Sequence, residues 1–314
     1  MNNLITEISW DLNDYCKAEC SYCPTKFRGG LEPAETKDYI RIANLLIDSY
    51  KSMGRSINWT FNGGEPLDMN DIVTLLKLCR ENGNSMTLHT NGGSLWMDWW
   101  AIEPYVDTVY LTYHYWQNPA LIKYIINTFQ NKQKELLLIV PIRPDHFDKD
   151  MDRAEEIEKI TYKWASKLKL YNNGDFSAGL FNYQPVQLAI MQGTIPRVQP
   201  TKPVEEPTPI EVVKTIEEKI DNSSDVKELK YFQKTTWDER YADRMNSNPK
   251  HAGRLCNVGI ERLHIGHTGW VRGSDCNNQP MGNIWHEGWM PPTGPQVCGM
   301  QVCESEADRR ITKF

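Results

Sequence analysis

Long apolar runs and an excess of basic residues are both missing from this 314-residue sequence. The first residues, Met1–Glu7, contain neither a basic segment nor an apolar stretch, so we do not expect a signal peptide. The most apolar stretch, Leu136–Val140, stops at Pro141 and is far too short to span a bilayer. The net charge of −6 argues against a broad basic surface for nucleic acid. We therefore expect a cytoplasmic protein with no membrane and no nucleic-acid partner.

Internal repeats and heptads are also lacking, and the first half of the chain alternates between strand-like and helix-like patterns. Apolar residues recur at helical spacing within residues 39–50, 72–79, 121–129 and 157–168. The expected strands lie between these helices and after them: Ile5–Leu12, Ile57–Phe61, Met86–Thr90, Thr108–His114, Glu135–Val140 and Tyr183–Ile190. Such alternation predicts an α/β fold with a parallel sheet, open or closed into a barrel, whose chemistry lies at the carboxyl ends of the strands.

The second half of the chain is organised differently. Residues 194–209 contain five prolines and few apolar residues, which is typical of a linker or a surface excursion. A short polar helix, Ile210–Ile220, and a charged segment follow. From His251 onward the sequence is rich in glycine, histidine, tryptophan and cysteine. We therefore predict a domain over residues 1–192, a proline-rich linker with a charged helical segment over 193–250, and a small cysteine-rich domain over 251–314.

Eight cysteines in a chain without an export signal favour metal or cluster ligation, because a reducing compartment keeps thiols free of disulfides. Cys16, Cys20 and Cys23 lie within eight residues, directly after the first expected strand. Thiolates in such a tight run hold iron–sulfur clusters, and three thiolates on a four-iron cubane leave one iron open to a small molecule. A zinc loop with a distant fourth ligand, or free cysteines, are the alternatives.

The spacing Cys-x3-Cys-x2-Cys, with Tyr22 before the third cysteine, resembles the radical S-adenosylmethionine (SAM) superfamily. Two further segments match in the same order: Asn62-Gly63-Gly64-Glu65-Pro66 after the second strand and Thr90-Asn91-Gly92 after the third. Either segment alone is an ordinary turn. The resemblance covers residues 4–140.

This resemblance implies a partial (β/α)6 TIM-like barrel that holds a [4Fe-4S] cluster and SAM. The open iron would chelate the SAM amine and carboxylate, and reductive cleavage would give a 5′-deoxyadenosyl radical that removes a hydrogen from the substrate. The cofactor-binding residues that it implies are Tyr22, Gly63, Gly64, Glu65, Pro66, Thr90 and Asn91. Glu65 would orient the SAM amine rather than act as an acid. The reductant would be a protein such as flavodoxin or ferredoxin.

A second set of cysteines, Cys256, Cys276, Cys298 and Cys303, supplies four ligands, which is enough to close a metal site. Its context, with Gly282-Asn283-Ile284 between ligands, resembles the auxiliary-cluster regions of the SPASM and twitch subfamilies. Full SPASM regions carry seven cysteines, and their usual Gly-x4-Cys is Gly269-x6-Cys276 here. The resemblance therefore implies one auxiliary [4Fe-4S] cluster, and a four-cysteine zinc site is the alternative.

The remaining polar candidates are histidines. His89 and His114 fall near the ends of the third and fourth strands, where a proton acceptor would serve an oxidative reaction, although a hydrogen-bonded structural role is the more common one at such positions. His264, His267 and His286 lie near the second cysteine set and are candidate hydrogen-bond partners of its ligands, or spare ligands themselves. Cys79 lies on the apolar face of an expected helix and is interpreted as a core residue.

The resemblance leads to an oxidoreductase-type enzyme that modifies a peptide or protein, or a small molecule, with help from the auxiliary cluster. A small-molecule dehydrogenase of the aminocyclitol type and an epimerase are alternatives within the superfamily. A non-enzymatic iron–sulfur electron carrier or a zinc-stabilised binding module is the alternative of another class. Cys16 lies so close to the start of the sequence that no peptide-recognition domain is expected before the barrel. This weakens the interpretation that the substrate is a peptide.

Overall fold

The computed structural model describes residues 4–18, 20, 23, 30, 34–82, 85–93, 97–130, 134–161, 165–169, 183–194, 196–197, 250–273, 280–301, 303 and 306–314. Strands and helices alternate through its first half, as the sequence predicts. The strands are β1 (Leu4–Asp11), β2 (Arg55–Asn62), β3 (Ser85–Thr90), β4 (Thr108–Thr112), β5 (Glu135–Ile142) and β6 (Ala165–Lys169). The helices are α1 (Thr36–Ser52), α2 (Ile72–Glu81), α3 (Trp99–Ile102), α4 (Pro119–Gln130), α5 (Phe147–Thr161) and α6 (Pro185–Met191).

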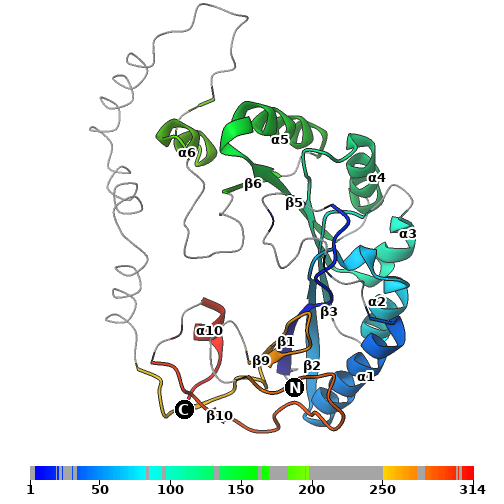
Figure 1. Cartoon of the computed structure of the whole chain (residues 1–314), viewed down its shortest axis with the longest axis vertical. Coiled ribbons are helices and arrows are strands. Elements are labelled where there is room, and N and C mark those ends of the chain that lie inside the picture. The colour runs from blue at the N-terminus through cyan, green and yellow to red at the C-terminus, as the bar shows by residue number, and fades with distance from the viewer. Residues whose placement is uncertain are drawn as a thin grey trace, which may run out of the picture.

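These strands belong to one curved sheet with the order β6-β5-β4-β3-β2-β1-β8-β9. Strands β1 to β6 pair in parallel, and β8 (Arg262–Ile265) adds to the free edge of β1, also in parallel. Only the short β9 (Val271–Arg272) pairs antiparallel in this sheet, within the residues described. Helices α1 to α5 lie along the outer face of the sheet (Figure 1). The predicted α/β fold with a parallel sheet is confirmed.

The two faces of the sheet differ in chemistry because side chains alternate along a strand. On β1 and β2 the residues toward the helices are buried and apolar, with Trp10, Trp59 and Phe61 at most 1% exposed. The alternate residues face the other way and are polar, and there the side-chain amide of Asn62 donates to the hydroxyl of Ser9 at 2.9 Å. The inner face of the sheet is thus suited to contact water or a polar ligand, unlike the packed interior of a closed barrel.

The sequence prediction was wrong around the sixth strand. Residues Tyr183–Ile190 are mainly helix α6, because Pro185 occupies its first turn and the side chains of Gln184 and Gln187 form a reciprocal capping box. The sixth strand is β6, which contains Leu168, a residue that the helical pattern had placed on the face of Ile157. The expected helix ends at Thr161 instead.

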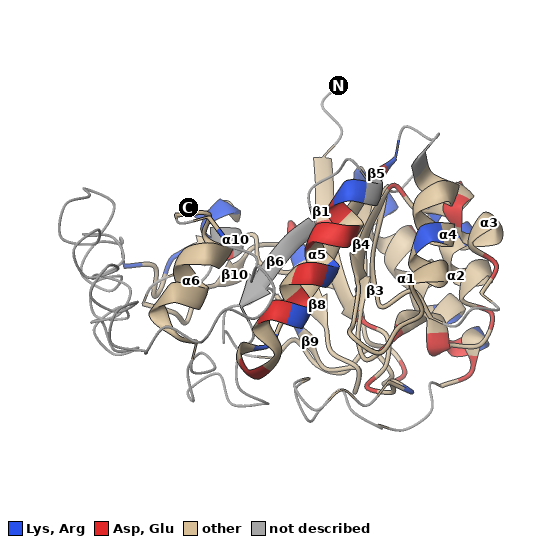
Figure 2. Ribbon diagram, turned by 90° about the horizontal axis from the view of Figure 1, so that it is seen from above, with Lys and Arg blue, Asp and Glu red and all other residues tan. Residues whose placement is uncertain are grey.

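Helix α5 carries many charged residues (Figure 2), and three of its acidic side chains bind Arg197, which follows α6. Arg197 has a side chain only 7% exposed, and its guanidinium pairs with Asp148, Asp152 and Glu155 at 2.7–3.3 Å. Most of the predicted proline-rich linker and the expected helix Ile210–Ile220 lie outside the described residues. The division into three units at residues 192 and 250 stays a prediction.

The C-terminal part consists of short strands and turns. Strands β7 (Leu255–Cys256) and β10 (Gln296–Val297) pair antiparallel, and helix α10 (Glu306–Arg310) precedes the final residues. The last residues lie against β7, where the backbone amide of Phe314 donates to the carbonyl of Leu255. Across the described residues, every helix falls short of the length and apolar character that a membrane crossing requires.

Candidate active site

The loop with the first three cysteines is held to the end of β2 by backbone hydrogen bonds. The amide of Gly64 donates to the carbonyl of Asn13, and the amide of Glu65 donates to the carbonyl of Tyr15, both at 2.8 Å. A Cβ atom on Gly64 would lie 2.2 Å from the Tyr15 oxygen, and one on Gly63 would lie 2.5 Å from the Asn13 oxygen. Glycine is therefore required at both positions, because only a bare backbone allows this approach.

Glu65 ties the end of β2 to the end of β3. Its side chain is 1% exposed and accepts hydrogen bonds from the Thr90 hydroxyl and from the backbone amides of Asn91 and Leu67. Burial raises the pKa of the Glu65 carboxyl to about 7, although these three hydrogen bonds oppose the shift. The carboxyl already binds the protein's own donors, so the expected contact with a SAM amine stays a prediction.

Two side chains from neighbouring loops donate to the cysteine sulfurs. The side-chain amide of Asn91 lies 3.6 Å from Sγ of Cys16, and the indole nitrogen of Trp116 lies 3.1 Å from Sγ of Cys20. Burial raises the pKa of the Cys16 thiol to about 11. The backbone amide of Cys23 donates to the carbonyl of Cys20. The fourth residue predicted in this loop, Tyr22, lies outside the described residues.

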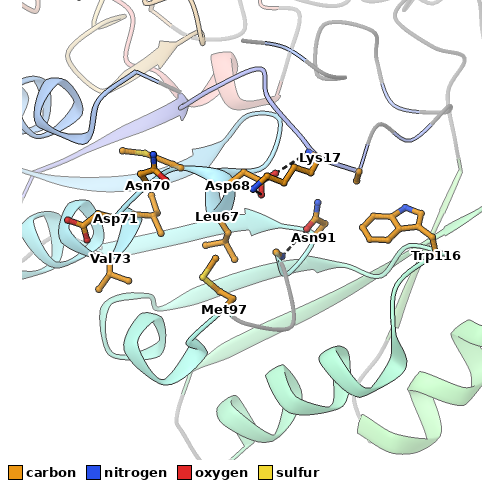
Figure 3. A pocket seen from close by; sticks show the side chains of 13 residues that line it. Lys17, Leu67, Asp68, Asn70, Asp71, Val73, Asn91, Met97 and Trp116 are labelled. Carbon is orange, nitrogen blue, oxygen red and sulfur yellow. Dashed lines mark hydrogen bonds and ion pairs between the residues drawn. The ribbon is translucent and has the colours of Figure 1, made fainter. Parts of the chain in front are cut away.

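A cavity of about 460 Å³ opens between residues 17–18 of the cysteine loop, residues 67–73 between β2 and α2, and the residues that follow β3 (Figure 3). Asn91 and Trp116 line it together with Leu67 and Met97, so both polar and apolar groups face the space. Lys17 borders it, with its ammonium 3.5 Å from the carboxylate of Asp68. This volume lies in the range that binds small organic ligands.

Of the two predicted proton acceptors, His89 lies on β3 and His114 lies two residues after the end of β4. His89 stacks on Tyr110 with ring centroids 4.4 Å apart, and burial lowers its pKa. His114 stacks on Trp116, lies 4.0 Å from Sγ of Cys20, and has a pKa lowered to about 4 by burial. Neutral His114 is therefore a weak base at neutral pH. A role for either histidine in catalysis stays a prediction.

The second cysteine set surrounds the β7–β10 pair. Cys256 ends β7, Cys298 follows β10, and Cys303 lies farther along the chain, with each residue only 5–6% exposed. Burial raises the pKa of the Cys256 and Cys303 thiols, and charge on the neighbouring thiols adds to this rise. Cys276 lies outside the described residues. The three described thiols therefore lie within electrostatic range of one another.

The Gly-Asn-Ile segment of this region forms a structural turn. The Asn283 side-chain amide donates to the carbonyl of Thr268, and the backbone amide of Ile284 donates to the carbonyl of Gly269. Ile284 itself is fully buried in the main core. The motif therefore joins the C-terminal part to the sheet.

Sequence reasoning missed the place of two histidines. His264 and His267 contact Asp11 and Asp14 beside the first cysteine loop, rather than serving only the second cysteine set. The pairing of β8 with β1 places them there, and nothing in the local pattern of Arg262–Ile265 signals that partner. Cys79 is fully buried in the core, as predicted.

The donor chemistry decides which kind of metal group would fit. In the part of the chain that the structure describes, no three His, Cys, Asp or Glu side chains are grouped to hold one metal ion. Ligands of a multi-iron cluster each bind a different iron, so they lie farther apart than ligands of a single ion. Three thiols on one loop, two of which accept N–H···S hydrogen bonds, fit such a cluster.

Comparison with known proteins gives limited guidance. No family model matches the chain, and no curated protein matches it. Among solved structures, SuiB of Streptococcus suis bound to S-adenosylmethionine is 15% identical with a TM-score of 0.49, and the match covers 90% of this chain and 64% of SuiB. The structure of anSMEcpe with bound AdoMet is 12% identical with a TM-score of 0.49, covering 90% of this chain and 75% of that one. BtrN in an open conformation is 14% identical with a TM-score of 0.37, covering 92% and 83%.

This chain thus spans about 64% of the length of SuiB. Every one of these TM-scores is below one half, so the likeness decides neither the chemistry nor the substrate of this protein. The functional assignment depends on the geometry of the site.

Proposed function

We propose that this chain is a radical SAM enzyme with its reaction centre at the carboxyl ends of β1, β2 and β3. One observation carries the proposal: three segments far apart in the sequence are joined by direct hydrogen bonds, and each of them also contributes residues to the lining of one cavity. Gly64 binds the stem of the cysteine loop, Glu65 binds Thr90 and Asn91, and Asn91 donates back to Cys16. A protein that only carried electrons would have no need for a ligand cavity beside its thiols.

Each part of this centre has a task that its chemistry supports. Cys16, Cys20 and Cys23 would hold a [4Fe-4S] cluster, and the N–H groups of Asn91 and Trp116 orient the first two sulfurs. When bound, the cluster would supply one electron for reductive cleavage of SAM, which gives a 5′-deoxyadenosyl radical able to remove a hydrogen atom from a substrate. The chain's own contribution is to carry the thiols on a loop whose residues Lys17 and Ala18 line a cavity of about 460 Å³, a volume suited to a small organic ligand.

The C-terminal cysteines fit a second centre in the same proposal. Cys256, Cys298 and Cys303 are buried near one another, and Cys276 would be the fourth ligand. An auxiliary [4Fe-4S] cluster there would exchange an electron with the substrate, as in an oxidative modification of a peptide, a protein or a small molecule. Zinc remains the alternative occupant, and metal content separates the two.

The test is anaerobic reconstitution followed by reaction with SAM and dithionite. We expect 5′-deoxyadenosine from the intact protein and none from the triple variant Cys16→Ala/Cys20→Ala/Cys23→Ala. Two cubanes hold about eight irons, so iron should fall to about four in that variant. Cys79→Ala, which removes a buried core thiol, is the matched control and should keep both the iron and the product. Equal traces of 5′-deoxyadenosine from the intact protein and the triple variant would refute the proposal and favour an electron carrier.

A further inference from the structure

The stem of the cysteine loop, residues 12–15, lies between two other parts of the chain. On one side it binds the end of β2 through the backbone hydrogen bonds of Gly64 and Glu65. On the other side lies β8, because β1 is placed between β2 and β8 in the sheet. The stem is therefore open to contact from the C-terminal segment.

Two side-chain contacts are made on that second side. Nε2 of His264 lies 3.7 Å from Oδ2 of Asp11, and Nε2 of His267 lies 3.8 Å from Oδ2 of Asp14. Asp11 and Asp14 are three residues apart, and so are His264 and His267. The two segments therefore continue side by side past the last paired residues, Trp10 and Ile265. Asp14 is two residues from Cys16, so these contacts reach the base of the proposed cluster site.

The histidines are presented by a well-anchored segment. Leu263, Ile265 and Val271 are completely buried in the main core, and they alternate with half-buried positions on β8 and with an exposed position on β9. The four contacting side chains are between 13% and 27% exposed, so water screens their interaction only in part. A fixed imidazole opposite a half-buried carboxylate restricts the backbone that carries it.

We infer that His264 and His267 are positioning residues that complete the SAM site from the C-terminal segment, by fixing Asp11 and Asp14 at the base of the cysteine loop. The predicted effect of the two histidines on SAM binding rests on the proposed function. Their predicted effect on the backbone of the cysteine loop does not. The segment that carries both histidines lies between Cys256 and Cys276, so one stretch of chain serves both cysteine sets.

The experiment uses the full-length, cluster-loaded protein and the double variant His264→Gln/His267→Gln. His286→Gln is the matched control, since the backbone amide of His286 binds Asn283 within its own turn. SAM affinity is read from the change that SAM causes in the EPR spectrum of the reduced N-terminal cluster. We expect the double variant to bind SAM about three- to tenfold more weakly, as the loss of two half-exposed contacts implies. His264→Lys, tested with His267 intact, places a positive charge opposite Asp11 and should bind SAM more tightly than His264→Gln.

Hydrogen exchange gives a second readout that does not depend on SAM. Amides of residues 12–16 should exchange faster in the double variant, whereas those of helix α4 should not change. Faster exchange in the loop without any SAM-dependent EPR change in the intact protein would support the positioning role and refute the proposed function. The inference would be overturned if the double variant matched His286→Gln in both loop exchange and SAM affinity. It would also be overturned if amide exchange in α4 accelerated as much as exchange in the loop.

Discussion

Replacing Glu65 by Gln tests how the carboxyl ends of β2 and β3 are joined. The substitution keeps the size of the side chain and removes its charge. In the wild type, burial places the folded-state pKa of Glu65 at about 7, against 4.5 for an exposed glutamate. The folded protein therefore holds a proton on Glu65 over a pH range in which the unfolded chain has released it.

The sign of the effect follows from this difference. Because the folded state binds the extra proton, the stabilisation is complete below pH 4.5 and is lost as the pH rises toward 7. A shift from 4.5 to about 7 corresponds to about 3 kcal/mol in total. Between pH 5.5 and pH 8, where a folded protein is easier to keep, the expected change is about 2 kcal/mol.

The assay compares the free energy of unfolding of wild type and Glu65→Gln by urea denaturation across that pH range. Other titrating groups contribute equally to both proteins and cancel in the difference. In the variant, the glutamine NH2 group faces the backbone N–H of Asn91, so two donors meet where a carboxylate oxygen accepted a hydrogen bond. This loss lowers the stability of the variant by an amount independent of pH. We expect the advantage of the wild type to shrink by about 2 kcal/mol from pH 5.5 to pH 8. A difference that stays constant with pH would refute the reasoning.

Two further substitutions test the packing around the site. Gly64→Ala would place a methyl group 2.2 Å from the Tyr15 carbonyl, so we expect iron incorporation at the first site to fall at least several-fold, whereas Gly294→Ala, in open space, should keep it. Asp150→Asn removes the charge of a fully buried carboxylate that binds two arginines, so the free energy of unfolding, measured by urea denaturation, should fall by about 3 kcal/mol. Asp145→Asn, at an exposed position, should change the free energy of unfolding very little. Unchanged iron in the first variant, or unchanged stability in the second, would contradict the corresponding contact.

The parallel sheet and the position of the candidate site were predictable because they depend on local patterns. Apolar residues at helical spacing mark α1, and the buried set Tyr39, Ala43, Leu46, Ile47 and Tyr50 lies on the predicted face. The three polar motifs each follow a strand, and parallel strands place their carboxyl ends on one edge. Local pattern and topology together therefore brought the cysteine loop, Glu65 and Asn91 to one place.

Two features were missed, one because local helix signals were overlooked and the other because it depends on long-range pairing. The Tyr183–Ile190 segment has a strand-like composition, but Pro185 and the capping of Gln184 by Gln187 favour a helix. The contact of His264 with Asp11 spans most of the chain and follows from the pairing of β8 with β1. Strand β8 has only four residues, which are too few for their hydrophobic pattern to indicate the strand with which they pair.

The addition of β8 to β1 has a consequence for the order of assembly. Glu7 pairs with Arg262, so the outer edge of the first strand stays without its neighbour until residue 262 has left the ribosome. An uncovered strand edge is open to association with other chains, and pairing across so many residues slows folding. The base of the cysteine loop therefore gains its last contact, that of His267 with Asp14, only after translation has passed residue 267.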